Sequence, residues 1–98
     1  MRLTPAQIAM YQLLGRQLPM GPREGIRDRI RSGREFLVSI TGRDFGYDAL
    51  RWHEYLWDTD AGGYRWSRRS REKWARLAVT AMDDTGWRQA VQELESEA

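Results

Sequence analysis

Apolar residues recur at intervals of three and four along nearly the whole chain, and this spacing constrains the fold more than any other feature. Across residues 5–18, 70–82 and 87–94 the apolar side chains fall on one side of a helix with 3.6 residues per turn. Strict alternation, typical of a half-buried strand, occurs only over residues 35–40. A strand without a neighbour would leave its backbone polar groups unpaired. We therefore expect an all-α fold, a small single-domain bundle of five to six short helices.

Local signals predict where the first helices begin and end. Thr4 followed by Pro5 and Gln7 is typical of a capping box with proline at the first helical position. A second helix is expected from Pro22. Residues 32–35 form another capping-box pattern, S-x-x-E, which favours a helix over residues 35–41 that kinks or restarts at Gly33. Strand remains the alternative for residues 35–41, and Gly42 is expected to end the helix.

Polar residues ahead of the later apolar stretches predict three further helices. The first of these should run to about residue 58. The loop over residues 60–63 is a candidate hinge, and residues 95–98 should fray. The expected N-caps, in chain order, are Asp44, then Ser67 or Ser70, then Asp84 or Thr85.

The length and composition of the chain limit the class of protein to which it can belong. A chain of 98 residues that is 41% hydrophobic suits one helical domain over residues 1–98. Cysteine is absent, which excludes disulfides and thiolate chemistry and fits a reducing compartment. No stretch approaches the ~20 apolar residues of a membrane span, and the N-terminus lacks the apolar core of a signal peptide. We expect a cytoplasmic protein with no membrane partner.

The chain has a single histidine, His53, beside Glu54. A zinc-protease helix would need a second histidine at position 57, which is tryptophan. Asp58 and Asp60 resemble the start of a calcium loop, but the twelfth position holds Arg69 instead of a bidentate glutamate. We therefore expect no catalytic residues, no metal and no cofactor, and we interpret His53 as a core residue. An enzyme centred on His53 is the third-ranked hypothesis.

The expected helix over residues 44–58 has an unusually wide apolar arc. The side chains that form its core stripe at 100° per residue are Phe45, Ala49, Trp52 and Leu56. Trp57 and Tyr55 widen the stripe on opposite sides. Two interpretations stay open: neighbouring helices cover both sides, or Trp57 or Tyr55 stays partly exposed as a binding anchor, a role in which both residue types are over-represented.

Residues 62–76 interleave arginines with aromatic side chains and form the strongest candidate for a binding site. Residues 64–76 contain six basic residues against one acidic residue, a net charge of +5, whereas residues 77–98 carry −4. Arginine forks bind phosphates or carboxylates, and aromatic faces stack on bases or on guanidinium groups. The candidate partner-binding residues are Tyr64, Arg65, Trp66, Arg68, Arg69, Arg71 and Trp57.

Three interpretations of this segment stay open. It binds an acidic surface of another protein, it binds nucleic acid, or its charges balance those of the acidic last helix within the molecule. The net charge of the chain, +2, is modest for a protein that mainly binds phosphates. Our leading hypothesis is a small non-catalytic protein-binding module, of the kind that serves as an immunity protein, antitoxin or inhibitor. The alternative is a small nucleic-acid-binding regulator that uses residues 64–76.

Overall fold

The computed structural model describes residues 3–16, 25–65 and 70–97. Within these ranges the chain forms five α-helices and one 3-10 turn, and no strand. The elements are α1 (Pro5–Leu13), α2 (Ile26–Thr41), α3 (Ala49–Thr59), η1 (Ala61–Gly63), α4 (Ser70–Asp83) and α5 (Thr85–Ser96). The predicted all-α fold is confirmed, and residues 35–41, for which a strand was the alternative, lie within α2.

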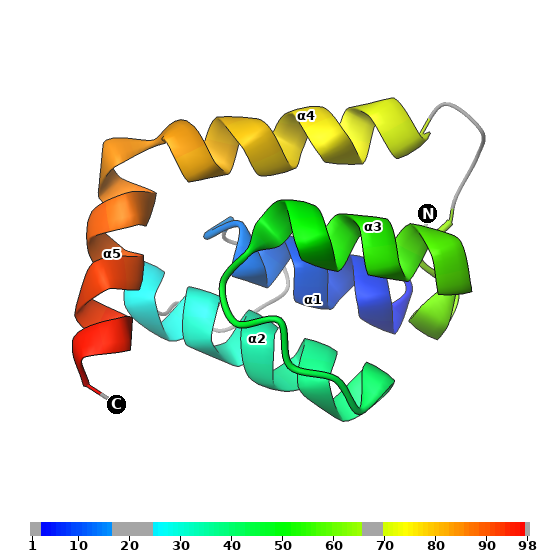
Figure 1. Ribbon diagram of the computed structural model, residues 1–98, viewed down its shortest axis with the longest axis horizontal. Coiled ribbons are helices and arrows are strands. Elements are labelled where there is room, and N and C mark those ends of the chain that lie inside the picture. Colours follow the sequence, from blue (N-terminus) through cyan, green and yellow to red (C-terminus); the bar gives the residue numbers. More distant parts are fainter. Residues whose placement is uncertain (1–2, 17–24, 66–69, 98) are drawn as a thin grey trace.

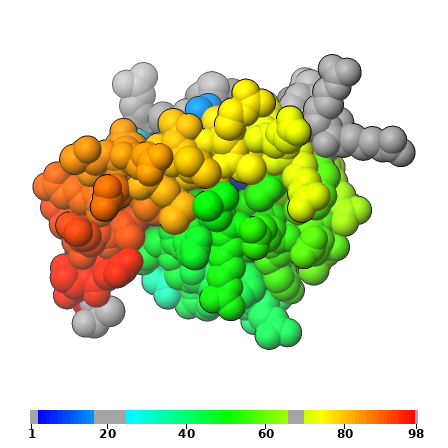
Figure 2. Space-filling view, turned by 45° about the horizontal axis from the view of Figure 1, so that its top comes forward, coloured from blue at the N-terminus to red at the C-terminus, as the bar shows by residue number. Residues whose placement is uncertain are grey.

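The helices form a bundle that α5 closes at one end (Figure 1). α1 and α2 run in opposite directions and pack against each other. Residues 42–48 return along the bundle, so that α3 starts near the same end as α2. α4 runs antiparallel to α3 and packs on it, and Figure 2 shows these two helices side by side on one face of the molecule.

α1 and α2 approach each other at Gly33. A methyl group built on Gly33 would lie 2.2 Å from the backbone nitrogen of Leu13 and 2.8 Å from the carbonyl oxygen of Ala9. Only glycine permits backbones this close. The predicted kink or restart at Gly33 was wrong, because α2 continues unbroken from Ile26 to Thr41. Its predicted end is confirmed, since Gly42 adopts the left-handed conformation with φ 70°.

Two of the predicted N-caps are confirmed. The Thr4 side chain accepts a hydrogen bond from the Gln7 backbone, and the Gln7 side chain accepts one from the Thr4 backbone, which completes the capping box of α1. At the start of α5 the Asp84 carboxylate accepts from the Trp87 backbone N–H at 3.0 Å. Pro22 and Ser67 lie outside the described residues, and Ser70 is the first residue of α4.

The predicted N-cap at Asp44 was wrong, because Asp48 caps α3 by accepting from the Arg51 backbone at 3.1 Å. A tight turn separates the two aspartates, with Gly46 at φ 64°. The Asp44 carboxylate instead accepts two hydrogen bonds from the Arg34 guanidinium, at 3.1 and 2.8 Å. The helix therefore begins four residues later than its sequence signal indicated.

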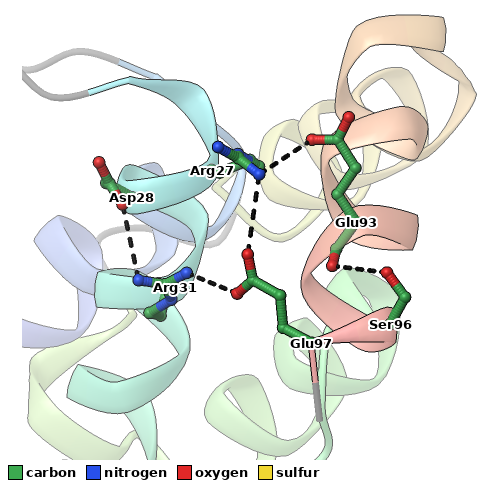
Figure 3. Close-up of polar contacts among 6 residues, drawn as sticks. All are labelled: Arg27, Asp28, Arg31, Glu93, Ser96 and Glu97. Carbon is green, nitrogen blue, oxygen red and sulfur yellow. Dashed lines mark hydrogen bonds and ion pairs between the residues drawn. The ribbon is translucent and has the colours of Figure 1, made fainter.

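The acidic end of the chain is tied to α2 (Figure 3). Arg27 lies 3.4 Å from the Glu93 carboxylate and 3.7 Å from that of Glu97, and Arg31 donates to Glu97 at 2.8 Å. The prediction that residues 95–98 fray was wrong for residues 95–97, because α5 continues to Ser96 and Glu97 is held by these contacts. In the part of the chain that is described, the carboxylates of Glu93 and Glu97 therefore pair with α2, not with residues 64–76.

The core is built mainly from apolar and aromatic side chains of all five helices. Its largest fully buried side chains are Trp52, Tyr64, Met10, Leu13, Ile30, Leu37 and Leu56. Trp87 joins α5 to α1, since its indole N–H donates to the Leu13 carbonyl at 2.9 Å. None of the helices in the described ranges is long and apolar enough to cross a membrane.

Candidate functional site

The turn η1 fixes the start of the arginine-rich segment. Gly62 and Gly63 both have positive φ, at 61° and 74°, and both lie close to α1. A methyl group on Gly62 would lie 2.9 Å from the Ala6 side chain, and the Thr4 hydroxyl donates to the Gly63 carbonyl at 2.9 Å. The glycines of η1 let its backbone lie directly against Thr4 and Ala6. η1 is therefore a turn packed at the start of α1 rather than the predicted hinge.

Tyr64, which directly follows this turn, points into the core and has no exposed surface. Its ring stacks on that of Trp74 in α4, with centroids 5.0 Å apart and planes at 30°. Its hydroxyl lies 2.7 Å from Nδ1 of His53, and its carbonyl accepts from the Gln7 side chain at 3.4 Å. Although the sequence placed Tyr64 among the partner-binding residues, its buried side chain supports the surface from below and offers a partner no contact area.

His53 is 4% exposed, and its Nδ1 lies within hydrogen-bonding distance of the Tyr64 hydroxyl. Burial lowers the pKa of His53 because it disfavours the imidazolium, and the positive charge of Arg71 lowers it further; Glu54 and Asp58 act in the opposite direction. Burial also raises the pKa of the Tyr64 hydroxyl. The Tyr64 hydroxyl has no other acceptor among the described residues, so we assign its proton to the hydrogen bond with Nδ1 and the imidazole proton to Nε2.

The position of His53 agrees with the core role that the sequence predicted for it. A general base must reach a proton of its substrate, and this imidazole is enclosed among Trp57, Tyr64 and its own helix. Within residues 3–16, 25–65 and 70–97 no group of three or more histidine or acidic side chains is arranged to hold a metal ion.

The surface above this buried pair carries Trp57 and Arg65. Trp57 is half-buried, with its ring edge-on to Tyr64 at 6.5 Å. The Arg65 guanidinium lies 5.6 Å from the Trp57 ring centroid, while its Nε donates to the Trp57 carbonyl at 2.6 Å and its Nη2 to the Asp58 carbonyl at 3.2 Å. A cation is favoured beside these last carbonyls of α3 because of the helix dipole. Arg65 is therefore fixed in place over the indole.

Arg71 extends this surface onto α4. Its side chain is exposed in the first turn of α4, the helix that packs on α3, and its positive charge acts on His53. We name Trp57, Arg65 and Arg71 together the Trp57 surface. Of the other predicted binding residues, Trp66, Arg68 and Arg69 lie outside the described residues.

Two parts of the site were missed by sequence reasoning. The hydrogen bond between His53 and Tyr64 links α3 to the segment after η1, and no spacing rule for a single helix signals it. The Asp60 carboxylate accepts from the Arg65 backbone at 2.9 Å and so orients the start of the arginine-rich segment. An aspartate just beyond a helix end, ahead of two glycines, is a turn signal that could have indicated this contact.

A second feature is an open hollow of about 340 Å³ between α2 and the loop over residues 42–48. Its lining residues are Arg31, Arg34, Glu35, Val38, Asp44 and Tyr47. The Arg34 guanidinium lies 4.7 Å from the Tyr47 ring centroid and lowers the pKa of the Asp44 carboxyl by hydrogen bonding to it. Because the Arg34 and Asp44 charges are neutralised by each other, the hollow presents little net charge to a ligand.

No protein-family model, no curated protein and no solved structure matches this chain. Function must therefore be argued from the surface itself. The Trp57 surface combines an aromatic face with fixed and exposed guanidinium groups, whereas in the hollow on α2 the Arg34 guanidinium is already paired with Asp44. The Trp57 surface is the stronger candidate for a binding site.

Proposed function

We propose that this chain is a small non-catalytic protein-binding module that docks an acidic surface of another protein on Trp57, Arg65 and Arg71. The observation that carries the proposal is the fixed pair of Trp57 and Arg65, held by two hydrogen bonds to the end of α3. Tryptophan and arginine dominate binding hot spots. A side chain that is already ordered also loses less conformational entropy on binding.

The distribution of ion pairs supports an acidic partner. The acidic side chains Glu93 and Glu97 of α5 pair with α2. By contrast, Arg71 and Arg76 form no ion pair with any residue that the structure describes. These two guanidinium groups are therefore available for carboxylates of a partner.

The alternative, a nucleic-acid-binding regulator that uses residues 64–76, is supported by the net charge of +5 in that segment. Exposed carboxylates of Glu54, Asp58 and Asp60 lie on α3 and just after it, close in sequence to Trp57. They would repel a continuous phosphate backbone, whereas a protein partner can place carboxylates against the arginines and basic or neutral side chains against Glu54, Asp58 and Asp60. We therefore rank the protein partner first.

A non-catalytic role is supported by the burial of His53, and a cytoplasmic location by the absence of cysteine. Both belong to this proposal. An immunity, antitoxin or inhibitor role would fit the same surface, because such roles need shape and charge and no reacting group.

Arg65→Ala tests the proposal, with Arg51→Ala as the matched control. Arg51 is an exposed arginine of α3, and its guanidinium lies 4.7 Å from the Phe45 ring centroid. Both variants therefore lose one positive charge and one contact with an aromatic ring. The tagged wild type and both variants would be used to capture proteins from an extract of the native organism, and the partner would then be purified for calorimetry. We expect Arg65→Ala to weaken binding by at least about tenfold and Arg51→Ala to leave it unchanged.

Equal affinity for all three proteins would contradict the proposal. The nucleic-acid alternative is measured with generic duplex DNA at about 50 and 200 mM salt. If the affinity for DNA falls steeply with salt and is lost in Arg71→Ala, nucleic acid becomes the favoured partner in place of a protein. Circular dichroism of each variant shows whether a loss of binding reflects a loss of fold.

A further inference from the structure

The buried pair of His53 and Tyr64 connects the two helices that carry the Trp57 surface. His53 belongs to α3, and its ring centroid lies 6.3 Å from that of Trp57. Tyr64 contacts Trp57 edge-on at 6.5 Å and stacks on Trp74 of α4 at 5.0 Å. A change at the hydrogen bond between His53 and Tyr64 therefore reaches Trp57 on α3 and Trp74 on α4.

Protonation of His53 at Nδ1 would remove the acceptor of this hydrogen bond. Neutral His53 accepts the Tyr64 hydroxyl proton at Nδ1, but the imidazolium carries a proton on both nitrogens and cannot accept. The Tyr64 hydroxyl has no other hydrogen-bond partner among the described residues. A proton on Nδ1 would thus leave the buried hydroxyl proton without an acceptor and place a charge in the core.

The charged groups that face His53 come from both helices packed around it. Arg71 on α4 repels an imidazolium, and Glu54 and Asp58 on α3 attract one. Burial and Arg71 prevail, so the pKa of His53 lies below its ordinary value of 6.5. Because the pKa is lowered in the folded state, the stability that the neutral ring contributes is fully present above pH 6.5. This contribution is lost as the pH falls through the pKa of His53 in the folded state.

We propose that His53 is a proton-responsive switch in which uptake of a proton at Nδ1 removes the acceptor of the Tyr64 hydroxyl and displaces Trp57 of α3 and Trp74 of α4. The Trp57 surface then has one shape in neutral solution and another in mild acid. The consequence for a partner, weaker binding in mild acid, rests on the proposed function. The switch itself is a property of the chain alone.

The test is an NMR titration of the ¹⁵N-labelled protein, without a partner, from pH 7.5 to 4.5. We expect the imidazole nitrogens of His53 and the backbone amides of Trp57, Arg65 and Arg71 to shift with one common midpoint below pH 6.5. In His53→Gln, whose side chain stays uncharged, the shared transition at these amides should disappear. Amide shifts that persist unchanged in His53→Gln, or a His53 midpoint at or above 6.5, would overturn the proposal.

Two charge variants keep the test decisive if His53→Gln fails to fold. Arg71→Gln removes the facing positive charge and should raise the His53 midpoint, and Glu54→Gln should lower it, each by on the order of a few tenths of a pH unit. Arg88→Gln, which removes an exposed charge from α5, is the matched control and should leave the midpoint unchanged. A midpoint that moves in none of the variants, or moves equally in all, would contradict the proposed charge environment.

These measurements separate the switch from the function that we propose for the surface. If the amides of the Trp57 surface follow His53 and no acidic partner is found, the switch stands and the proposed function fails. If a partner binds at the Trp57 surface with the same affinity at pH 7.5 and 5.5, the proposed function stands and the switch does not act on binding.

Discussion

The crossing of α1 and α2 predicts that Gly33→Ala destabilises the protein, although alanine is the better helix former. In an exposed helix this substitution would stabilise by about 1 kcal/mol. At Gly33 the added methyl group would lie 2.2 Å from the Leu13 nitrogen, and ordinary contacts begin near 3.4 Å. The obstructing atoms belong to the backbone of α1, so no side-chain rotation relieves the contact and α1 must move by about 1 Å.

The cost of that movement can be estimated from what α1 contributes to the core. Ala9, Met10 and Leu13 have no exposed surface, and Leu13 also accepts the hydrogen bond from Trp87. Overpacking of a core costs roughly 1–3 kcal/mol, and loosened contacts on the far side of α1 add to it. The loosened contacts roughly offset the gain of about 1 kcal/mol in helix propensity, so we expect a net loss of about 1–3 kcal/mol, a sizeable part of the 5–15 kcal/mol typical of a domain.

Urea unfolding, followed by circular dichroism and by tryptophan fluorescence, measures this loss. A decrease of that size should lower the thermal midpoint by about 4–24 °C in a chain of this length. Gly86→Ala is the matched control, because Gly86 lies in a helix and its nearest obstructing atom is a carboxylate oxygen of Asp84 at 3.2 Å. Gly86→Ala should leave stability unchanged or raise it by up to about 1 kcal/mol. If Gly33→Ala proves as stable as the wild type, the close approach of the two helices is refuted.

Three further substitutions test contacts elsewhere. Tyr64→Phe removes the donor to His53 and should cost about 1–3 kcal/mol in urea unfolding at pH 7.5, since a buried acceptor loses its partner; an unchanged midpoint would contradict the hydrogen bond. Asp84→Ala removes the N-cap of α5 and should cost about 1 kcal/mol in a thermal melt, with Thr85→Ala as a control at the next residue. Glu97→Gln should lower the free energy of unfolding by less than about 1 kcal/mol, because its ion pairs with Arg27 and Arg31 are exposed. Salt at 1 M should abolish this difference, and a difference that persists in salt would show that the ion pairs are not its cause.

The parts of the fold that the sequence predicted correctly depend on contacts within four residues. The capping box at Thr4, the cap at Asp84 and the terminal glycine of α2 are all of this kind. Asp44, which the sequence favoured as the cap, instead accepts hydrogen bonds from the Gly46 backbone and from Arg34, and the contact with Arg34, ten residues away, is not encoded by a local pattern. The capping-box pattern ahead of residue 35 was likewise overridden, because the continuous α2 packs against α1 at Gly33.

The candidate site was predicted only in part, for the same reason. The over-wide apolar arc of α3 indicated that Trp57 or Tyr55 could stay partly exposed, and both are half-buried. Tyr64 was grouped with its arginine neighbours because it lies between them in sequence. In the structure, η1 packs on α1 and directs Tyr64 inward to His53, a contact across eleven residues that depends on where the whole chain folds back.

The core and the Trp57 surface share one aromatic cluster. Loss of binding therefore means something different when the changed residue is buried in that cluster than when it is exposed. A change at Tyr64 or Trp74 alters packing beneath the surface, so lost binding would not show that either residue touches a partner. Arg65 and Arg71 are exposed, and changing them leaves the stack of Tyr64 on Trp74 intact. Loss of binding at both arginines, with unfolding midpoints unchanged, would therefore assign the contact to the surface, whereas loss confined to the buried rings would assign it to the fold.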